Sequence, residues 1–465
     1  MKIFFLLSIL SLTAQFSFSQ NNVTLYGTIT DPKGDYAYVK YYRDFISYDE
    51  VTVDSAKLDK KGNYTMNFSW PAPGAATFYH GDEITQMFLT PGDSLSLSLD
   101  TKEFDETVVY QGRGSKINSY LAAKALKFGY LGATEYKMKE SEFTPMLDSI
   151  HEAEESFLSN YFKGSGHLEE IRDFLLTELA DILYGWANYK TSYPGLNQYL
   201  NKRTFPTVLP DDYYDFMKVI RIYNPDAIHS SSYLEFLGDY VDRESWKLVA
   251  ADSVQTFRQH KEQFIDRNVP GVLKEYILAH WTYETLTQEN DLEFGTYLLN
   301  KIKRESPRNS YMELLERTVR IASTLSPGHP APNFTLPDAK GKMVSLSDFR
   351  GKVVYLDIWA TWCGPCRAEI PQALKLEEEM RNRDVVFLSV SVDEDEKAWK
   401  KMIKEKEMKG VHLISKGNFE STVAKLYNVK GIPQYVIIDQ KGNIVTNNAE
   451  RPSGKAKESL EALLE

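Results

Sequence analysis

The spacing of hydrophobic and polar positions changes twice along the chain. Over residues 23–111, short β-prone runs are broken by turn residues, and leucines at 95–99 alternate with serines, which is typical of a half-buried strand. Over residues 115–325, apolar residues recur at three- and four-residue steps instead, as between Ile171 and Trp186, which predicts amphipathic helices. The pattern therefore predicts an antiparallel β domain followed by an all-α domain.

The proline-rich segment 326–332 ends the helical pattern and marks a boundary. Strands and helices alternate after it, with strands expected at 353–358, 385–392, 411–414, 434–439 and from 444, and helices at 367–380, 396–408, 419–427 and from 454. This alternation predicts an α/β domain with a mostly parallel central sheet. The expected fold class is multidomain α+β, with domains at 20–114, 115–325 and 333–465 and a linker at 326–332.

The first residues have the pattern of a secretory signal peptide. Lys2 precedes an apolar run at 3–12, and Ser17-Phe18-Ser19 places small residues ahead of Gln20. The apolar run is too short to span a bilayer, and no later stretch reaches about 18 uninterrupted apolar residues. We expect a signal peptide at 1–19, a mature chain without a transmembrane segment, and a location in the periplasm or cell envelope.

Charge and composition limit the classes of function. The 465 residues carry a formal net charge of −11, which argues against a nucleic-acid partner held by bulk basic charge. The residues before Pro327 carry about −12 and the rest about +1. We interpret the acidic portion as a solubilising surface.

The chain has two cysteines, Cys363 and Cys366. A bridge across so short a loop would constrain little of the unfolded chain, so a structural disulfide is a poor explanation. A zinc site would need two more ligands, and the eight histidines are scattered. Redox chemistry remains, with the dithiol itself as the reactive group and neither cofactor nor metal.

Cys363 lies between the predicted strand 353–358 and a helix, where free N–H groups and the helix dipole favour a thiolate. Cys366, one turn into the helix, would resolve the mixed disulfide. Asp357 interrupts the apolar strand, and a carboxyl buried there would have a raised pKa and could exchange a proton with Cys366. The alternative for Asp357 is an edge position that faces water.

Gly431-Ile432-Pro433 comes directly before the predicted strand 434–439. A trans proline would suit a central strand badly. A cis Ile432–Pro433 bond would solve this by starting the strand with a tight turn, but the sequence leaves the isomer open.

Together these motifs resemble the thioredoxin superfamily, and more closely its exported TlpA/ResA-type thiol–disulfide oxidoreductases. The likeness spans about residues 327–465 and rests on Trp359–Arg367, Leu346–Lys352, Pro371 and Gly431–Pro433. It implies a thioredoxin-like C-terminal domain in which Pro371 kinks the active-site helix. It assigns Cys363 as the nucleophile, Cys366 as the resolving thiol, Asp357 as the buried acid, and a substrate-binding surface of Trp362, Gly364, Pro365, Ile432 and the cis-proline Pro433.

The resemblance implies an exported enzyme that reduces disulfides of envelope proteins, apocytochrome c among them, with electrons from a membrane partner. Gly364-Pro365 and Asp357 match cytoplasmic thioredoxin rather than the usual TlpA/ResA pattern, and this dipeptide favours the reducing end of the potential range. The β domain resembles a domain of unknown function found ahead of such modules, which implies no activity.

Two other functions stay open. A thiol oxidase or isomerase would use the same residues, and a binding or scaffold protein could carry the redox domain as an accessory. A thiol peroxidase is disfavoured, because Leu356 and Ala360 occupy the positions where its motif requires Pro and Thr.

Overall fold

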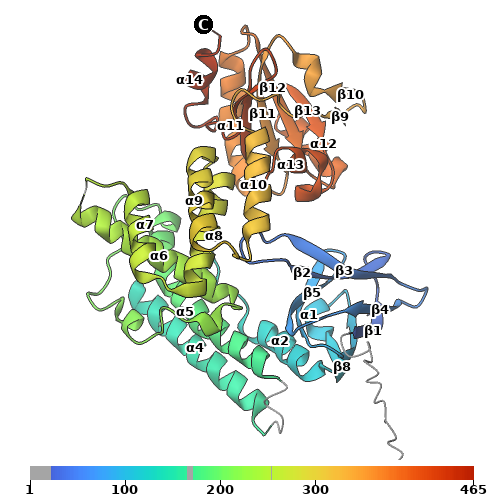
Figure 1. Cartoon of the computed structure of the whole chain (residues 1–465). Coiled ribbons are helices and arrows are strands. Elements are labelled where there is room, and N and C mark those ends of the chain that lie inside the picture. Colours follow the sequence, from blue (N-terminus) through green and yellow to red (C-terminus); the bar gives the residue numbers. More distant parts are fainter. Residues whose placement is uncertain (1–21, 165–170, 253, 465) are drawn as a thin grey trace, which may run out of the picture. The chain divides into compact units, whose positions relative to one another are not determined.

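The computed structural model describes residues 22–164, 171–252 and 254–464, so the predicted signal peptide lies outside the described residues. The chain divides into two compact units, one ending at Leu273 and the other beginning at Lys274. Strands come first, helices follow, and an α/β region comes last, which confirms the expected fold class (Figure 1). The finer division into three domains and a linker stays a prediction.

The first unit begins with two four-stranded sheets, ordered β4-β1-β7-β8 and β3-β2-β5-β6. Their strands are β1 (Asn22–Thr30), β2 (Tyr36–Tyr42), β3 (Glu50–Lys57), β4 (Asn63–Ser69), β5 (Gly74–His80), β6 (Glu83–Leu89), β7 (Ser94–Asp100) and β8 (Val109–Arg113). Neighbouring strands pair antiparallel except β1 and β7, which pair parallel. The leucines of β7 are buried and alternate with more exposed residues, as their spacing predicts.

Apolar side chains from the two sheets meet in one core. Leu25 of β1 and Leu97 of β7 belong to the same buried cluster as Val39 of β2 and Phe78 of β5. The two sheets therefore bury their apolar faces against each other, as in a β-sandwich.

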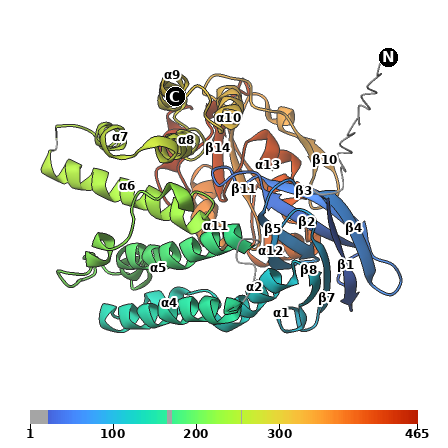
Figure 2. The ribbon, with the colours of Figure 1, turned by 60° about the horizontal axis from the view of Figure 1, so that its bottom comes forward.

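One short helix lies between β7 and β8, and the other helices of the first unit follow the sheets. In chain order they are α1 (Phe104–Thr107), α2 (Ser115–Phe128), α3 (Ala133–Tyr136), α4 (Glu140–Phe162), α5 (Arg172–Leu200), α6 (Ser231–Ala251) and α7 (Phe257–Asn268), with short 3₁₀ turns at Asp215–Lys218 and Pro225–Ala227. Figure 2 shows α4, α5 and α6 side by side. Phe174 and Ile182 of α5 are buried with Tyr120 of α2 and Leu158 of α4, so the predicted apolar stripe forms a helical core.

The second unit is an α/β layer structure preceded by helices. Helix α8 (Gly271–Thr287) begins just before the boundary and leads to α9 (Leu292–Glu305), α10 (Met312–Thr324), the hairpin of β9 (Thr335–Pro337) and β10 (Met343–Ser345), and a 3₁₀ turn at Leu346–Phe349. The remaining elements are β11 (Val353–Trp359), α11 (Gly364–Glu379), β12 (Val385–Ser391), α12 (Glu396–Glu405), β13 (Val411–Ile414), a 3₁₀ turn at Asn418–Glu420, α13 (Thr422–Leu426), β14 (Gln434–Ile438), β15 (Ile444–Thr446) and α14 (Ala456–Glu461).

The central sheet has the order β13-β12-β11-β14-β15. Strands β11, β12 and β13 are parallel, whereas β14 and β15 run antiparallel to their neighbours. Only β14 therefore runs against the direction of the other four strands, which agrees with the expected mostly parallel sheet. Strand β11 lies between β12 and β14, in the interior of the sheet.

Both faces of β11 are buried. Val354 and Leu356 belong to a cluster that includes Trp399 of α12 and Val423 of α13. Tyr355, on the other face, packs with residues of α11 and α14. Because side chains alternate along a strand, Asp357 shares a face with Tyr355 and is directed toward α11.

Among the described residues, none of the helices combines the length and the apolar character that a membrane span requires.

Candidate active site

Cys363 stands at the junction between β11 and α11 and forms a disulfide with Cys366. Helix α11 begins at Gly364, three residues earlier than the sequence predicts, which makes Cys363 its N-cap residue. The N–H of Cys366 donates to Cys363 Sγ at 3.1 Å, and the carbonyl oxygen of Ile432 lies 3.6 Å from the same sulfur. A thiolate at this position would accept that N–H and benefit from the helix dipole.

The two cysteines differ in surroundings rather than in exposure. Cys363 is 5% exposed and Cys366 is 4% exposed. Cys366, together with Asp357 and Glu369, lines a cavity of about 40 Å³ beneath α11. That volume holds a water molecule, so protons could pass between these groups directly or through one water.

Asp357 lies on an interior strand, and the residue as a whole is half-buried. Its Oδ1 is buried and has no hydrogen-bond partner within the described part of the chain. Burial raises the pKa of Asp357 to about 7, the nearby Glu369 carboxylate acts in the same direction, and a hydrogen bond with Ser389 opposes the shift. The alternative of an edge position is wrong, because β11 is an interior strand.

Glu369 is a second carboxyl at this cavity, and the sequence reasoning missed it. It is buried, and its side chain accepts hydrogen bonds from the N–H and hydroxyl of Ser453 at 3.0 and 2.8 Å. The available signal was its position three residues after Cys366, which places both side chains on one face of a helix.

Asp393, also missed, fixes the loop that leads to Cys363. It is 1% exposed and follows β12. Its carboxylate accepts the N–H of Thr361 at 2.9 Å, the hydroxyl of Thr361 at 2.7 Å and the hydroxyl of Ser391 at 2.6 Å. Since β11 and β12 are parallel, both end at the same edge of the sheet. The position of Asp393 directly after the second predicted strand was therefore the signal in the sequence that placed it near Cys363.

The surface beside Cys363 includes the predicted substrate-binding residues. Gly364 and Pro365 are exposed, Ile432 and Pro433 are half-buried, and the Ile432–Pro433 bond is cis. Trp362 is 52% exposed. Trp362, Gly364 and Pro365 are near Cys363 because they adjoin it in the chain. Ile432 and Pro433 are near it because the Ile432 carbonyl oxygen contacts the Cys363 sulfur.

Phe419 extends this surface. It is 41% exposed, and its ring lies 6.1 Å from that of Trp362 in an edge-to-face arrangement. Nothing in the sequence distinguishes Phe419 from other exposed aromatics, because its place beside Trp362 depends on the fold.

No group of three or more His, Cys, Asp or Glu side chains that could hold a metal ion occurs within residues 22–164, 171–252 and 254–464.

The model of the Redoxin family matches residues 326–464. Thiol-disulfide oxidoreductase ResA of Bacillus thuringiensis subsp. konkukian is 34% identical over 137 residues, which cover 30% of this chain and 76% of the relative. ResA of Bacillus subtilis is 33% identical over 26% of this chain and 66% of its own length. A solved thioredoxin domain of a thiol-disulfide oxidoreductase from Bacteroides vulgatus is 31% identical over 30% of this chain and 99% of that domain, with a TM-score of 0.28.

The dithiol at a helix N-terminus and the C-terminal match define a thiol–disulfide oxidoreductase of the thioredoxin superfamily. Within that class, the chain belongs to the TlpA/ResA-type family through its C-terminal domain. The expected family and enzyme class are confirmed.

Proposed function

We propose that this protein is exported and reduces disulfides of cell-envelope proteins through Cys363 and Cys366. One observation carries the proposal. The disulfide lies at the start of α11, and Cys366 faces a buried carboxyl whose pKa is about 7. An acid with that pKa can give and take a proton at neutral pH.

The first step begins from the reduced protein. The Cys363 thiolate attacks one sulfur of the substrate disulfide. A bond forms between Cys363 Sγ and that sulfur, the substrate disulfide breaks, and its other sulfur leaves with the electron pair as a thiolate. The Cys366 N–H and the dipole of α11 stabilise the attacking thiolate, which is the reason for assigning this role to Cys363.

The second step releases the substrate. Asp357 accepts the proton of Cys366, and the resulting thiolate attacks Cys363 Sγ. The Cys363–Cys366 disulfide forms, and the mixed disulfide breaks to release the second substrate thiolate. The substrate has then gained two electrons, and the described structure corresponds to the oxidised enzyme.

Each turnover consumes two electrons, which a donor must return to the disulfide. We assign this role to a membrane partner, because an oxidising envelope does not itself maintain a reductant. Export is supported by the signal-peptide pattern of residues 1–19. Apocytochrome c is among the substrates that the family resemblance favours.

The reduction potential tests the direction of the reaction. Equilibration of the full chain with glutathione buffers should give a value nearer thioredoxin, about −270 mV, than the oxidant DsbA, about −120 mV. That interval corresponds to roughly 7 kcal/mol for two electrons. A potential near the DsbA end would assign an oxidase or isomerase instead.

Trapping tests the substrate class. Cys366→Ser should accumulate mixed disulfides through Cys363, and mass spectrometry should identify envelope proteins in them. Cys363→Ser is the matched control and should trap none. The protein is a scaffold rather than a reductase under two conditions. Cys366→Ser traps no mixed disulfide, and a pull-down recovers the same partners after residues 327–465 are deleted.

A further inference from the structure

A second, larger cavity lies wholly within the first unit. Its volume is about 810 Å³, at the upper end of the usual range for ligand pockets. One wall includes the end of β2 and the start of β5, together with residues of β3 and β6 and the segment between β4 and β5. The other includes the first turns of α5 and the segment before α6. Its large apolar side chains include Tyr41, Phe45, Trp70, Phe88 and Leu176.

The opening arises because β2 and β5 separate. They pair from Ala37↔His80 to Lys40↔Thr77 and no further. The pairing of β2 with β3 shifts register between Val39 and Lys40, and such a bulge bends a strand. Beyond it, Tyr41 and Tyr42 pair with β3, while Gly74–Ala76 pair with β6.

Each of the two strands therefore has a backbone edge without a strand partner among the described residues. Both stretches line the cavity. Residues 74–76 are Gly-Ala-Ala, so few side-chain atoms cover the edge of β5. An edge of this kind is a template for another extended chain.

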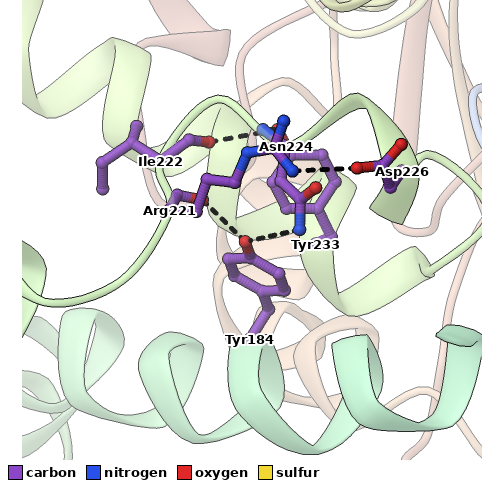
Figure 3. A network of polar contacts seen from close by, with 6 residues as sticks. All are labelled: Tyr184, Arg221, Ile222, Asn224, Asp226 and Tyr233. Atoms are coloured by element: carbon purple, nitrogen blue, oxygen red, sulfur yellow. Dashed lines mark hydrogen bonds and ion pairs between the residues drawn. The ribbon is translucent and has the colours of Figure 1, made fainter.

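The helical wall is held in place by a polar network (Figure 3). Tyr184 of α5 donates to the carbonyl of Arg221 at 2.6 Å and accepts from the Asn224 side chain at 3.2 Å. Tyr233 of α6 accepts the N–H of Asn224 at 2.7 Å and donates to the carbonyl of Ile222 at 3.1 Å.

This network fixes the segment that leads to two residues of the wall, Asp226 and His229. Arg221 also forms an ion pair with Asp226 at 2.8 Å. A wall fixed before binding lowers the ordering cost of taking up a ligand.

We propose that this cavity, the strand-edge groove, binds an extended polypeptide segment that carries apolar side chains. The segment pairs through its main chain with β5 or β2, as in β-augmentation. Its alternate side chains contact Trp70 and Phe88 on one side and Leu176 on the other. Free main-chain edges favour a polypeptide over a lipid or other small apolar molecule, which has no strand to pair. This function goes beyond the redox reaction, because binding needs neither cysteine.

The test uses the full chain and a polypeptide without thiols or disulfides. The probe is fluorescein-labelled α-lactalbumin that has been reduced and S-carboxymethylated, which keeps it unfolded and inert toward the dithiol. Fluorescence anisotropy should report saturable binding, and excess native α-lactalbumin should not compete. Absence of saturable binding, or equal competition by the native protein, would overturn the proposal.

A matched pair of variants on α5 locates the binding. Leu176 lines the groove and is 44% exposed, whereas Leu179 on the same helix is 49% exposed and does not line it. Leu176→Glu should weaken probe binding at least tenfold, and Leu179→Glu should leave it unchanged. Equal affinities for the two variants would refute the assignment.

A second pair of variants lies on the strands, so that its result does not depend on whether the substitutions on α5 disturb that helix. Ala75→Trp should fill the groove and weaken binding, and Thr52→Trp, at an exposed position outside the groove on β3, should not. All four variants should still reduce a small disulfide, so a failure of the redox proposal is seen separately.

Two outcomes would assign another occupant and overturn the proposal. In one, palmitate binds the wild-type protein, fails to bind Leu176→Glu, and is not displaced by the unfolded probe. In the other, sedimentation shows a wild-type dimer that Ala75→Trp converts to a monomer, which would place a second copy of the chain in the groove.

Discussion

Replacing Asp357 by asparagine removes a carboxyl whose ionisation destabilises the folded second unit. Burial raises the pKa of Asp357 from its ordinary 3.8 to about 7, so the folded state holds this proton more tightly than the unfolded state does. Its contribution to stability is therefore greatest below about pH 4 and is lost as pH rises through about 7. At about 1.4 kcal/mol per pKa unit, the full loss is roughly 4 kcal/mol, of which about 2.5 kcal/mol falls between about pH 5 and pH 8.

The expected result is a change in pH dependence. Relative to Asp357→Asn, the wild-type unit should lose about 2.5 kcal/mol of unfolding free energy between about pH 5 and pH 8. Pulse-labelling hydrogen exchange along a urea titration, read on the peptide that covers β11, reports this unit separately from the rest of the chain. The matched control is Asp338→Asn, because hydrogen bonds from the backbone lower the pKa of Asp338 and it stays ionised across this range. Parallel pH profiles for wild type and Asp357→Asn would refute the reasoning.

Three further substitutions test individual contacts. Asp393→Ala leaves the N–H and hydroxyl of Thr361 without their acceptor. Urea unfolding should show the second unit destabilised by about 1–3 kcal/mol, and turnover assays should show a lower kcat/KM for a disulfide substrate. Unchanged stability and turnover would contradict this prediction. Phe419→Ser should raise KM for a protein disulfide and leave reduction of a small aromatic disulfide unchanged, and equal effects on both would remove Phe419 from the docking surface. Glu369→Gln removes the like charge near Asp357, so an infrared carboxyl titration should show the pKa of Asp357 fall below about 7, and an unmoved midpoint would count against their coupling.

Features that depend on consecutive residues could be predicted from the sequence. The redox pair, the place of Asp357 within a buried strand and the Ile432–Pro433 turn each follow from a short motif and its position in or beside a strand. The predicted start of α11 is wrong by three residues, because the Gly364-Pro365 dipeptide does not reveal that Cys363 caps the helix.

Features that depend on distant segments could not be predicted. Asp393 reaches Thr361 only because β11 and β12 pair in one register, and Phe419 reaches Trp362 through a loop whose path is set by packing. The strand-edge groove likewise depends on a bulge that no local pattern marks. Tertiary pairing, rather than local propensity, decides such contacts.

The cap at Cys363 affects how knock-out variants should be read. Its sulfur accepts the N–H of Cys366, the third residue of α11, and the second residue is a proline, which has no N–H to offer. Alanine at this position would remove both the nucleophile and the helix start, at a cost of about 1 kcal/mol, whereas serine is itself a strong N-cap residue. A loss of activity in Cys363→Ala can therefore come from fraying of the first turn of α11 or from the missing nucleophile. Cys363→Ser keeps a capping side chain, so its loss of activity reports the missing sulfur alone.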